Sequence, residues 1–173
     1  MEKTIIYIGG YQSSGHKAGY FTEKLNCDLA IFAPDYDKED PVKIRKEIIQ
    51  AIERAISEGK QVEIIGSSTG GMTALLLQEH FNLKMYLINP LLAKEQFIDQ
   101  EHPVGPQLKP LSRILLNQEY KNNQIIIYLG KNDELLNPDY TRDFASKKKI
   151  TTIEFEGDHA GVESLDMIIK DIE

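Results

Sequence analysis

Short runs rich in β-branched residues alternate with helix-like segments, and this alternation restricts the possible folds more than any other feature of the chain. The expected strands cover residues 4–8, 28–33, 62–65, 83–88, 124–129 and 151–155. Helical segments separate most of these strands, so successive strands run in the same direction. The sequence therefore predicts an α/β fold with about six mainly parallel strands and helices on both faces.

The segment after Pro34 carries the clearest helix signals. Asp40 suits the N-cap position, and Pro41 suits the first helical position, because an N–H there would find no partner within the helix. Gly59 suits a left-handed helix end. The apolar positions recur at steps of three and four and form one stripe: Ile44, Ile48, Ala51, Ile52, Ala55 and Ile56. Further helices are expected at about 14–25, directly after 66–71, and at 138–147 and 162–172.

Length, composition and charge limit the class of protein. The 173 residues are expected to form a single domain over 1–173, and 41% hydrophobic residues are too many for a disordered chain. A net charge of −7 argues against nucleic acid or an anionic membrane as a partner. The first residues lack the pattern of a secretory signal, which predicts a cytoplasmic location. The single cysteine, Cys27, rules out a disulfide framework, and the oligomeric state stays open.

Residues 89–123 interrupt the alternation. They carry four of the seven prolines, Pro90, Pro103, Pro106 and Pro110, and only short helical patches at 91–98 and 111–118. Two interpretations are equally open. The segment either partly covers a site at the strand ends, or it is an irregular connection without a role in binding.

The loop after the third expected strand has the pattern Gly66-Ser67-Ser68-Thr69-Gly70, a G-x-S-x-G motif between a strand and a helix. In this arrangement a tight turn exposes the central serine at the helix N-terminus, and the glycines allow strand and helix to approach closely. The pattern predicts that Ser68 is a nucleophile. The alternatives are a plain turn of glycine and serine or a phosphate-binding loop.

A serine nucleophile needs a base, and four histidines are available. His159 directly follows the last expected strand, at the sheet edge where a parallel arrangement also places Ser68. It is therefore the expected base. The others lie in the first loop, near the end of the helix after the serine, and in the proline-rich segment: His16, His80 and His102.

The base needs an orienting carboxylate from another strand end. Asp133 follows the fifth expected strand and is the predicted acid, with Glu134 and Asp158 as competitors. The order Ser68, Asp133, His159 matches the Ser, Asp, His order typical of this kind of scaffold.

An oxyanion hole would complete such a site. The turn geometry supplies one backbone N–H, that of Thr69, which follows the nucleophile. The second donor is expected in the loop after the first strand, where Tyr11 is the first candidate and Gln12 the next. Losing one such donor costs about 2.7–4 kcal/mol of transition-state stabilisation.

The same first loop has a pattern close to a phosphate-binding motif. Residues 10–17 nearly match G-x-x-x-x-G-K-[ST], but Lys17 comes one place late and Ala18 stands where a metal-binding hydroxyl is needed. A nucleotide- or flavin-binding domain therefore remains only a weaker alternative. The sequence predicts no cofactor and no metal.

With these residues, the chain resembles the α/β-hydrolases, and more narrowly the small bacterial YqiA-like esterases. The segments that carry the resemblance are residues 6–11, 66–71, 88–90, 130–134 and 157–160. The resemblance implies ester hydrolysis through Ser68, Asp133 and His159, with no cofactor and no large cap domain. Gly9-Gly10 stands where family members commonly have His-Gly, and residues 89–123 align poorly, so the resemblance does not transfer a substrate preference.

The sequence thus predicts a serine hydrolase that cleaves carboxylic esters, or thioesters, of small or flexible acyl groups through an acyl-enzyme intermediate. Its expected partner is a small acyl ester substrate. The alternative is a protein of the same fold that binds a ligand or a partner without catalysis.

Overall fold

The computed structural model describes residues 2–102, 109–121 and 124–173. Six strands form one sheet: β1 (Lys3–Ile8), β2 (Asp28–Phe32), β3 (Gln61–Ser67), β4 (Lys84–Ile88), β5 (Ile125–Gly130) and β6 (Thr151–Phe155). The helices are α1 (His16–Lys24), α2 (Pro41–Ser57), α3 (Thr69–Leu77), α4 (Lys109–Asn117), α5 (Pro138–Lys148) and α6 (Leu165–Ile172). The six predicted strands are confirmed.

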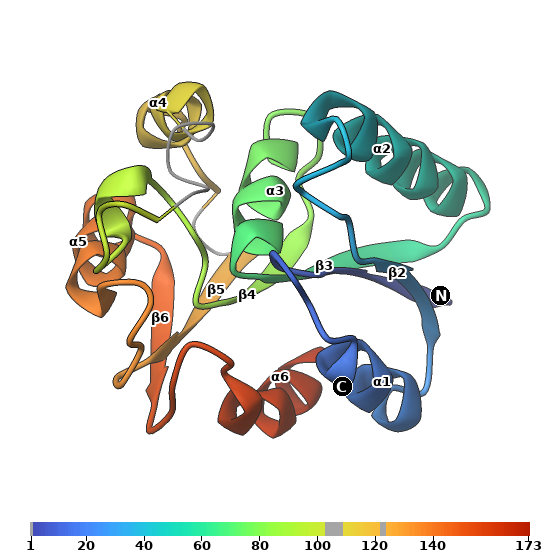
Figure 1. Cartoon of the computed structure of the whole chain (residues 1–173). Coiled ribbons are helices and arrows are strands. Elements are labelled where there is room, and N and C mark those ends of the chain that lie inside the picture. The colour runs from blue at the N-terminus through green and yellow to red at the C-terminus, as the bar shows by residue number, and fades with distance from the viewer. Residues whose placement is uncertain (1, 103–108, 122–123) are drawn as a thin grey trace.

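The strand order is β2-β1-β3-β4-β5-β6, and every neighbouring pair is parallel. Helices α1 and α6 cover one face, and α2 to α5 lie on the other (Figure 1). The winding reverses between β1 and β3, because the chain first builds β2 on one side of β1 and then returns to the other side. In an open parallel sheet, such a reversal opens a crevice at the carboxyl ends of the strands, where ligands bind.

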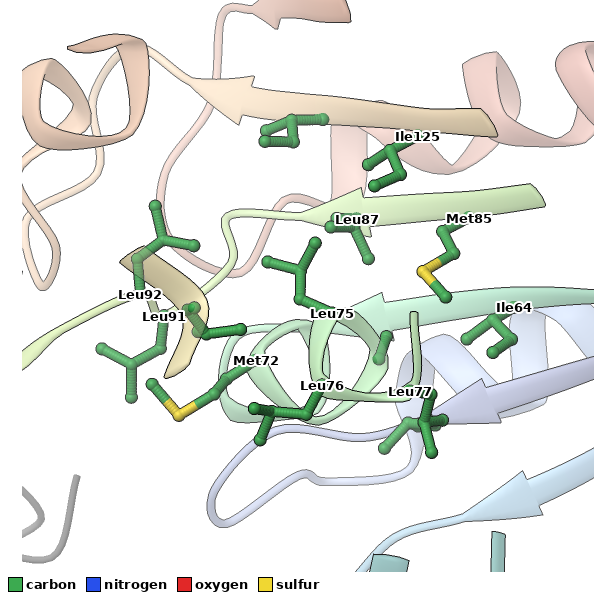
Figure 2. Packing of buried hydrophobic residues seen from close by; sticks show 14 of the residues in the cluster. Ile64, Met72, Leu75, Leu76, Leu77, Met85, Leu87, Leu91, Leu92 and Ile125 are labelled. Atoms are coloured by element: carbon green, nitrogen blue, oxygen red, sulfur yellow. The ribbon is translucent and has the colours of Figure 1, made fainter. Parts of the chain in front are cut away.

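The larger core lies between the sheet and α2 to α5. The stripe predicted for α2 is confirmed at Ile44, Ile48 and Ile52, which are at most 3% exposed, whereas Ile56 at its end is 46% exposed. The Asp40 carboxylate accepts a hydrogen bond from Val42 N. Helix α3 is buried almost all round, and its side chains pack against those of the central strands (Figure 2). A rigid, well-packed helix therefore follows Ser68.

Replacing Leu75 by alanine is expected to reduce the free energy of unfolding by about 2–5 kcal/mol, because a fully buried leucine leaves a cavity. Leu75 is 0% exposed in α3, whereas Leu116 in α4 is 44% exposed. Leu116→Ala is the matched control and should change stability by less than about 1 kcal/mol. Urea titration of both variants measures the difference, and equal losses would contradict the packing described for α3.

The region 89–123 differs in part from the prediction. The expected helical patch at 91–98 contains only a short 3₁₀ turn, Lys94–Gln96. The Gln96 side chain binds backbone groups that would pair with other backbone groups in a helix. Its Oε1 accepts a hydrogen bond from Leu92 N, and its Nε2 donates one to Pro90 O. The expected patch at 111–118 largely coincides with α4, Lys109–Asn117. Pro103 and Pro106 lie outside the described residues.

Candidate active site

The turn between β3 and α3 holds Ser68 in a rare backbone conformation, with φ 53° and ψ −117°. Its glycines are needed for close approach. A Cβ on Gly66 would lie 2.8 Å from Gly70 O, and one on Gly70 would lie 2.1 Å from Ile8 O. A non-glycine residue in this region costs about 1–3 kcal/mol, so the surrounding structure must hold Ser68 in this conformation, and such strain is typical of functional positions.

Ser68, His159 and Asp133 form one chain of hydrogen-bonded side chains. Ser68 Oγ lies 3.0 Å from His159 Nε2, and His159 Nδ1 lies 2.8 Å from Asp133 Oδ2. The three residues come from the loops after β3, β6 and β5, at the carboxyl edge of the sheet. The predicted nucleophile, base and acid are thus within hydrogen-bonding distance in the expected order.

Asp133 is held in place on its other side as well. Its side chain is 1% exposed, and its Oδ1 accepts hydrogen bonds from Leu135 N at 2.9 Å and Leu136 N at 2.8 Å. The competing carboxylates lie elsewhere: Glu134 is exposed, and Asp158 Oδ1 accepts from Ala160 N. Only Asp133 among the three is hydrogen-bonded to the His159 ring.

The other histidines have different surroundings. His80 is exposed beyond the end of α3, with its ring nitrogen 2.8 Å from Arg45. His16 is exposed at the start of α1, and His102 stacks on Phe97 with ring centroids 4.3 Å apart. His16 and His102 line the pocket above Ser68, but neither is hydrogen-bonded to it in the structure.

The loop after β1 lies directly against the serine. A Cβ on Gly10 would come within 2.9 Å of the Ser68 Cβ. Gly10 and Ser13 close a turn through a hydrogen bond of 3.3 Å, and Gln12 has a positive φ of 51°. The Tyr11 hydroxyl donates to Asp37 Oδ2 at 2.7 Å, which ties this loop to the segment after β2.

A second tyrosine holds the start of this loop, at Gly9. The Tyr36 hydroxyl donates to Gly9 O at 3.0 Å, and burial raises the pKa of Tyr36 to about 12. Tyr11 and Thr69, the two predicted oxyanion donors, both line the pocket over Ser68.

The pocket above Ser68 has a volume of about 330 Å³. Its apolar lining residues are Leu91, Phe97, Leu135, Ala160 and Val162. The lining also includes Lys17, whose Nζ donates to Ala160 O at 2.7 Å. Burial lowers the pKa of Lys17, and the nearby Asp158 carboxylate partly opposes that shift. The lysine of the near-match to a phosphate loop therefore contacts the loop that carries His159.

No group of three or more His, Cys, Asp or Glu side chains within 2–102, 109–121 and 124–173 is arranged to hold a metal ion. Over the same ranges, none of the helices combines the length and the apolar character needed to cross a bilayer.

Comparisons with known proteins agree with this fold. The model of an uncharacterised protein family, UPF0227, matches residues 4–171. The chain belongs to the UPF0227 family. This membership confirms the predicted resemblance to the YqiA-like proteins. No curated protein matches the sequence of this UPF0227 member.

Solved structures resemble it over nearly its full length. TT1662 from Thermus thermophilus has a TM-score of 0.78 at 12% identity and covers 99% of this chain and 87% of its own. The esterase Pf2001 from Pyrococcus furiosus has a TM-score of 0.66 at 15% identity, covering 99% and 79%. A Xanthomonas campestris protein, whose name places it in the alpha/beta superfamily of hydrolases, has a TM-score of 0.65 at 16% identity, covering 98% and 95%. The predicted α/β-hydrolase fold is confirmed.

One residue near the site was given no role by the sequence analysis. Asn89 is 1% exposed directly after β4, with a positive φ of 41°. Its side chain contacts the loops that carry Asp133 and His159. The only local signal is an asparagine before a proline at a strand end, which is also typical of ordinary turns.

Proposed function

We propose that this UPF0227 protein is a serine hydrolase that cleaves carboxylic esters, and thioesters of the same kind, through an acyl-enzyme intermediate. The observation that supports the proposal is the hydrogen-bonded chain from Ser68 through His159 to Asp133, next to a pocket. A strained serine at a helix N-terminus, whose hydroxyl is within hydrogen-bonding distance of a histidine ring nitrogen, has the arrangement of an activated nucleophile.

The proposed reaction has two halves. His159 Nε2 removes the proton of Ser68 as the serine oxygen attacks the carbonyl carbon of the ester, and Asp133 stabilises the charged imidazole. The imidazolium then gives its proton to the leaving alcohol or thiol. A water molecule, deprotonated by His159, next attacks the acyl-serine and releases the acid, and the proton returns to Ser68.

The negative oxygen of the tetrahedral intermediate needs donors. The N–H of Thr69 is in the first turn of α3, where helix N–H groups lack partners within the helix. The N–H of Tyr11 is the second proposed donor, supported by the close approach of its loop to Ser68. The hydrogen bonds of Tyr36 and Tyr11 hold that loop, so its donor would be oriented before substrate binds.

The pocket supports small or flexible acyl groups. Its volume of about 330 Å³ is at the small end of ligand sites, and its apolar lining residues suit an alkyl chain. For p-nitrophenyl esters, kcat/KM is expected to rise from acetate to butyrate by about fourfold for each methylene buried. Longer chains extend into solvent, so the gain should stop near hexanoate. A steep rise that continues to palmitate would contradict this acyl site.

The proposal is tested by the intact mass of the protein after incubation with a fluorophosphonate probe. We expect one adduct on Ser68, no adduct in Ser68→Ala and at least a 100-fold slower reaction in His159→Ala. His80→Ala is the matched control, because His80 is remote from Ser68, and it should react like the wild type. A folded wild-type protein that forms no adduct would favour the alternative, a binding protein of the same fold without catalysis.

A further inference from the structure

We propose that Asn89 is a positioning residue for this reaction, because its single amide side chain holds the loops of both the acid and the base. The inference rests on the proposed function. Asn89 follows β4, which lies between β3 and β5, and its backbone N donates to Tyr128 O at 3.0 Å. The residue is therefore fixed at the carboxyl edge of the sheet, beside the site.

Both polar atoms of the Asn89 amide form hydrogen bonds. Its Oδ1 accepts a hydrogen bond at 2.7 Å from the N–H of Gly130, the last residue of β5, directly before the loop that carries Asp133. Its Nδ2 donates to Asp158 O at 2.9 Å and to His159 O at 3.1 Å. Only an amide offers one acceptor and two donors in this geometry, so the partners also determine which way the amide points.

Asn89 is buried, so water cannot replace these hydrogen bonds if the amide is removed. Asn89 is 1% exposed, and its neighbours leave little space: a Cβ on Gly161 would lie 3.4 Å from Asn89 Nδ2 and 2.4 Å from a methyl of Ile88. The two loops also contact each other, since Asn132 N donates to Gly157 O at 3.0 Å. Asn89 adds the link from this loop pair to β4. The backbone of His159 is thus held relative to the strand next to the one that carries Ser68.

The positive φ of Asn89 also suggests its role. A left-handed conformation is tolerated by asparagine and favoured by glycine. A residue chosen only for the turn could be glycine. The residue at this position is instead asparagine, and its amide, which glycine lacks, contacts the two loops.

The Asn89→Gly variant separates the two roles, because glycine keeps the backbone conformation and removes only the amide. With p-nitrophenyl butyrate we expect kcat to fall by about 10- to 100-fold, since small errors in the position of a catalytic group are costly, while KM stays within about twofold. Asn89→Asp should be at least as impaired, because a carboxylate would place an acceptor against two carbonyl oxygens. The fluorophosphonate reaction at Ser68 should slow in parallel.

Asp40→Ala is the control for loss of stability alone. It removes the N-cap of α2 at a residue that does not line the pocket above Ser68, and should lower the melting temperature without changing kcat. Wild-type kcat in Asn89→Gly, a KM change without a kcat change, or a glycine variant that does not fold would each overturn the positioning role. If the wild type neither hydrolyses esters nor reacts with the probe, the proposed function fails and the role of Asn89 fails with it.

Discussion

Replacing Ser68 by alanine is expected to lower kcat for ester hydrolysis by about 10⁵- to 10⁶-fold, because no other group can form the acyl-enzyme. The melting temperature should change little. Alanine and serine have the same strain at φ 53°, and the loss at the side chain is one half-buried hydrogen bond to His159. Initial rates with p-nitrophenyl butyrate and a thermal melt measure both quantities.

Ser68→Gly provides a second control on the same residue. It should be equally inactive but more stable than Ser68→Ala by about 1 kcal/mol, because glycine adopts positive φ without strain. An active Ser68→Ala protein would contradict the mechanism. A glycine variant less stable than the alanine variant would contradict only the strain argument.

Asp133→Asn is expected to lower kcat by about 10³- to 10⁴-fold. The reason is the pair of N–H donors, from Leu135 and Leu136, that hold Asp133 Oδ1. In the variant these donors keep the amide oxygen, so the NH₂ group faces His159 Nδ1. That ring nitrogen must then accept a hydrogen bond, which moves the proton of the neutral ring to Nε2 and leaves no base for the Ser68 proton.

Glu134→Gln is the matched control, because it removes the same charge one residue further along the chain. Glu134 is exposed, so its substitution should change kcat by less than about twofold. Steady-state kinetics of the two variants at one pH suffice. The opposite ranking would move the acid from Asp133 to Glu134.

The local pattern predicted most of the scaffold. The apolar residues of strands and of helices recur with different periods, so the two kinds of element can be told apart in the sequence. The N-cap of α2 at Asp40 depends only on nearby residues. The prediction was wrong at the end of one strand and in the segment 91–98. Strand β3 continues through Gly66 to Ser67, although glycine usually ends a strand, because Gly66 is paired with Ile8 on one side and Leu87 on the other. The 3₁₀ turn at Lys94–Gln96 replaces a predicted helix through side-chain hydrogen bonds of Gln96.

The sequence by itself determined the fold class, through the alternation of strands and helices. It pointed to Ser68, because the motif that forms the turn between β3 and α3 lies within five consecutive residues. It also pointed to His159 and Asp133, through their places after strands. Only the tertiary structure shows which of Asp133, Glu134 and Asp158 is hydrogen-bonded to His159, and only it brings the Asn89 side chain to the loops of the proposed acid and base. His159 lies 26 residues from Asp133 and 91 from Ser68. Contacts over such separations depend on strand order and on the directions of side chains at the sheet edge, which no local pattern encodes.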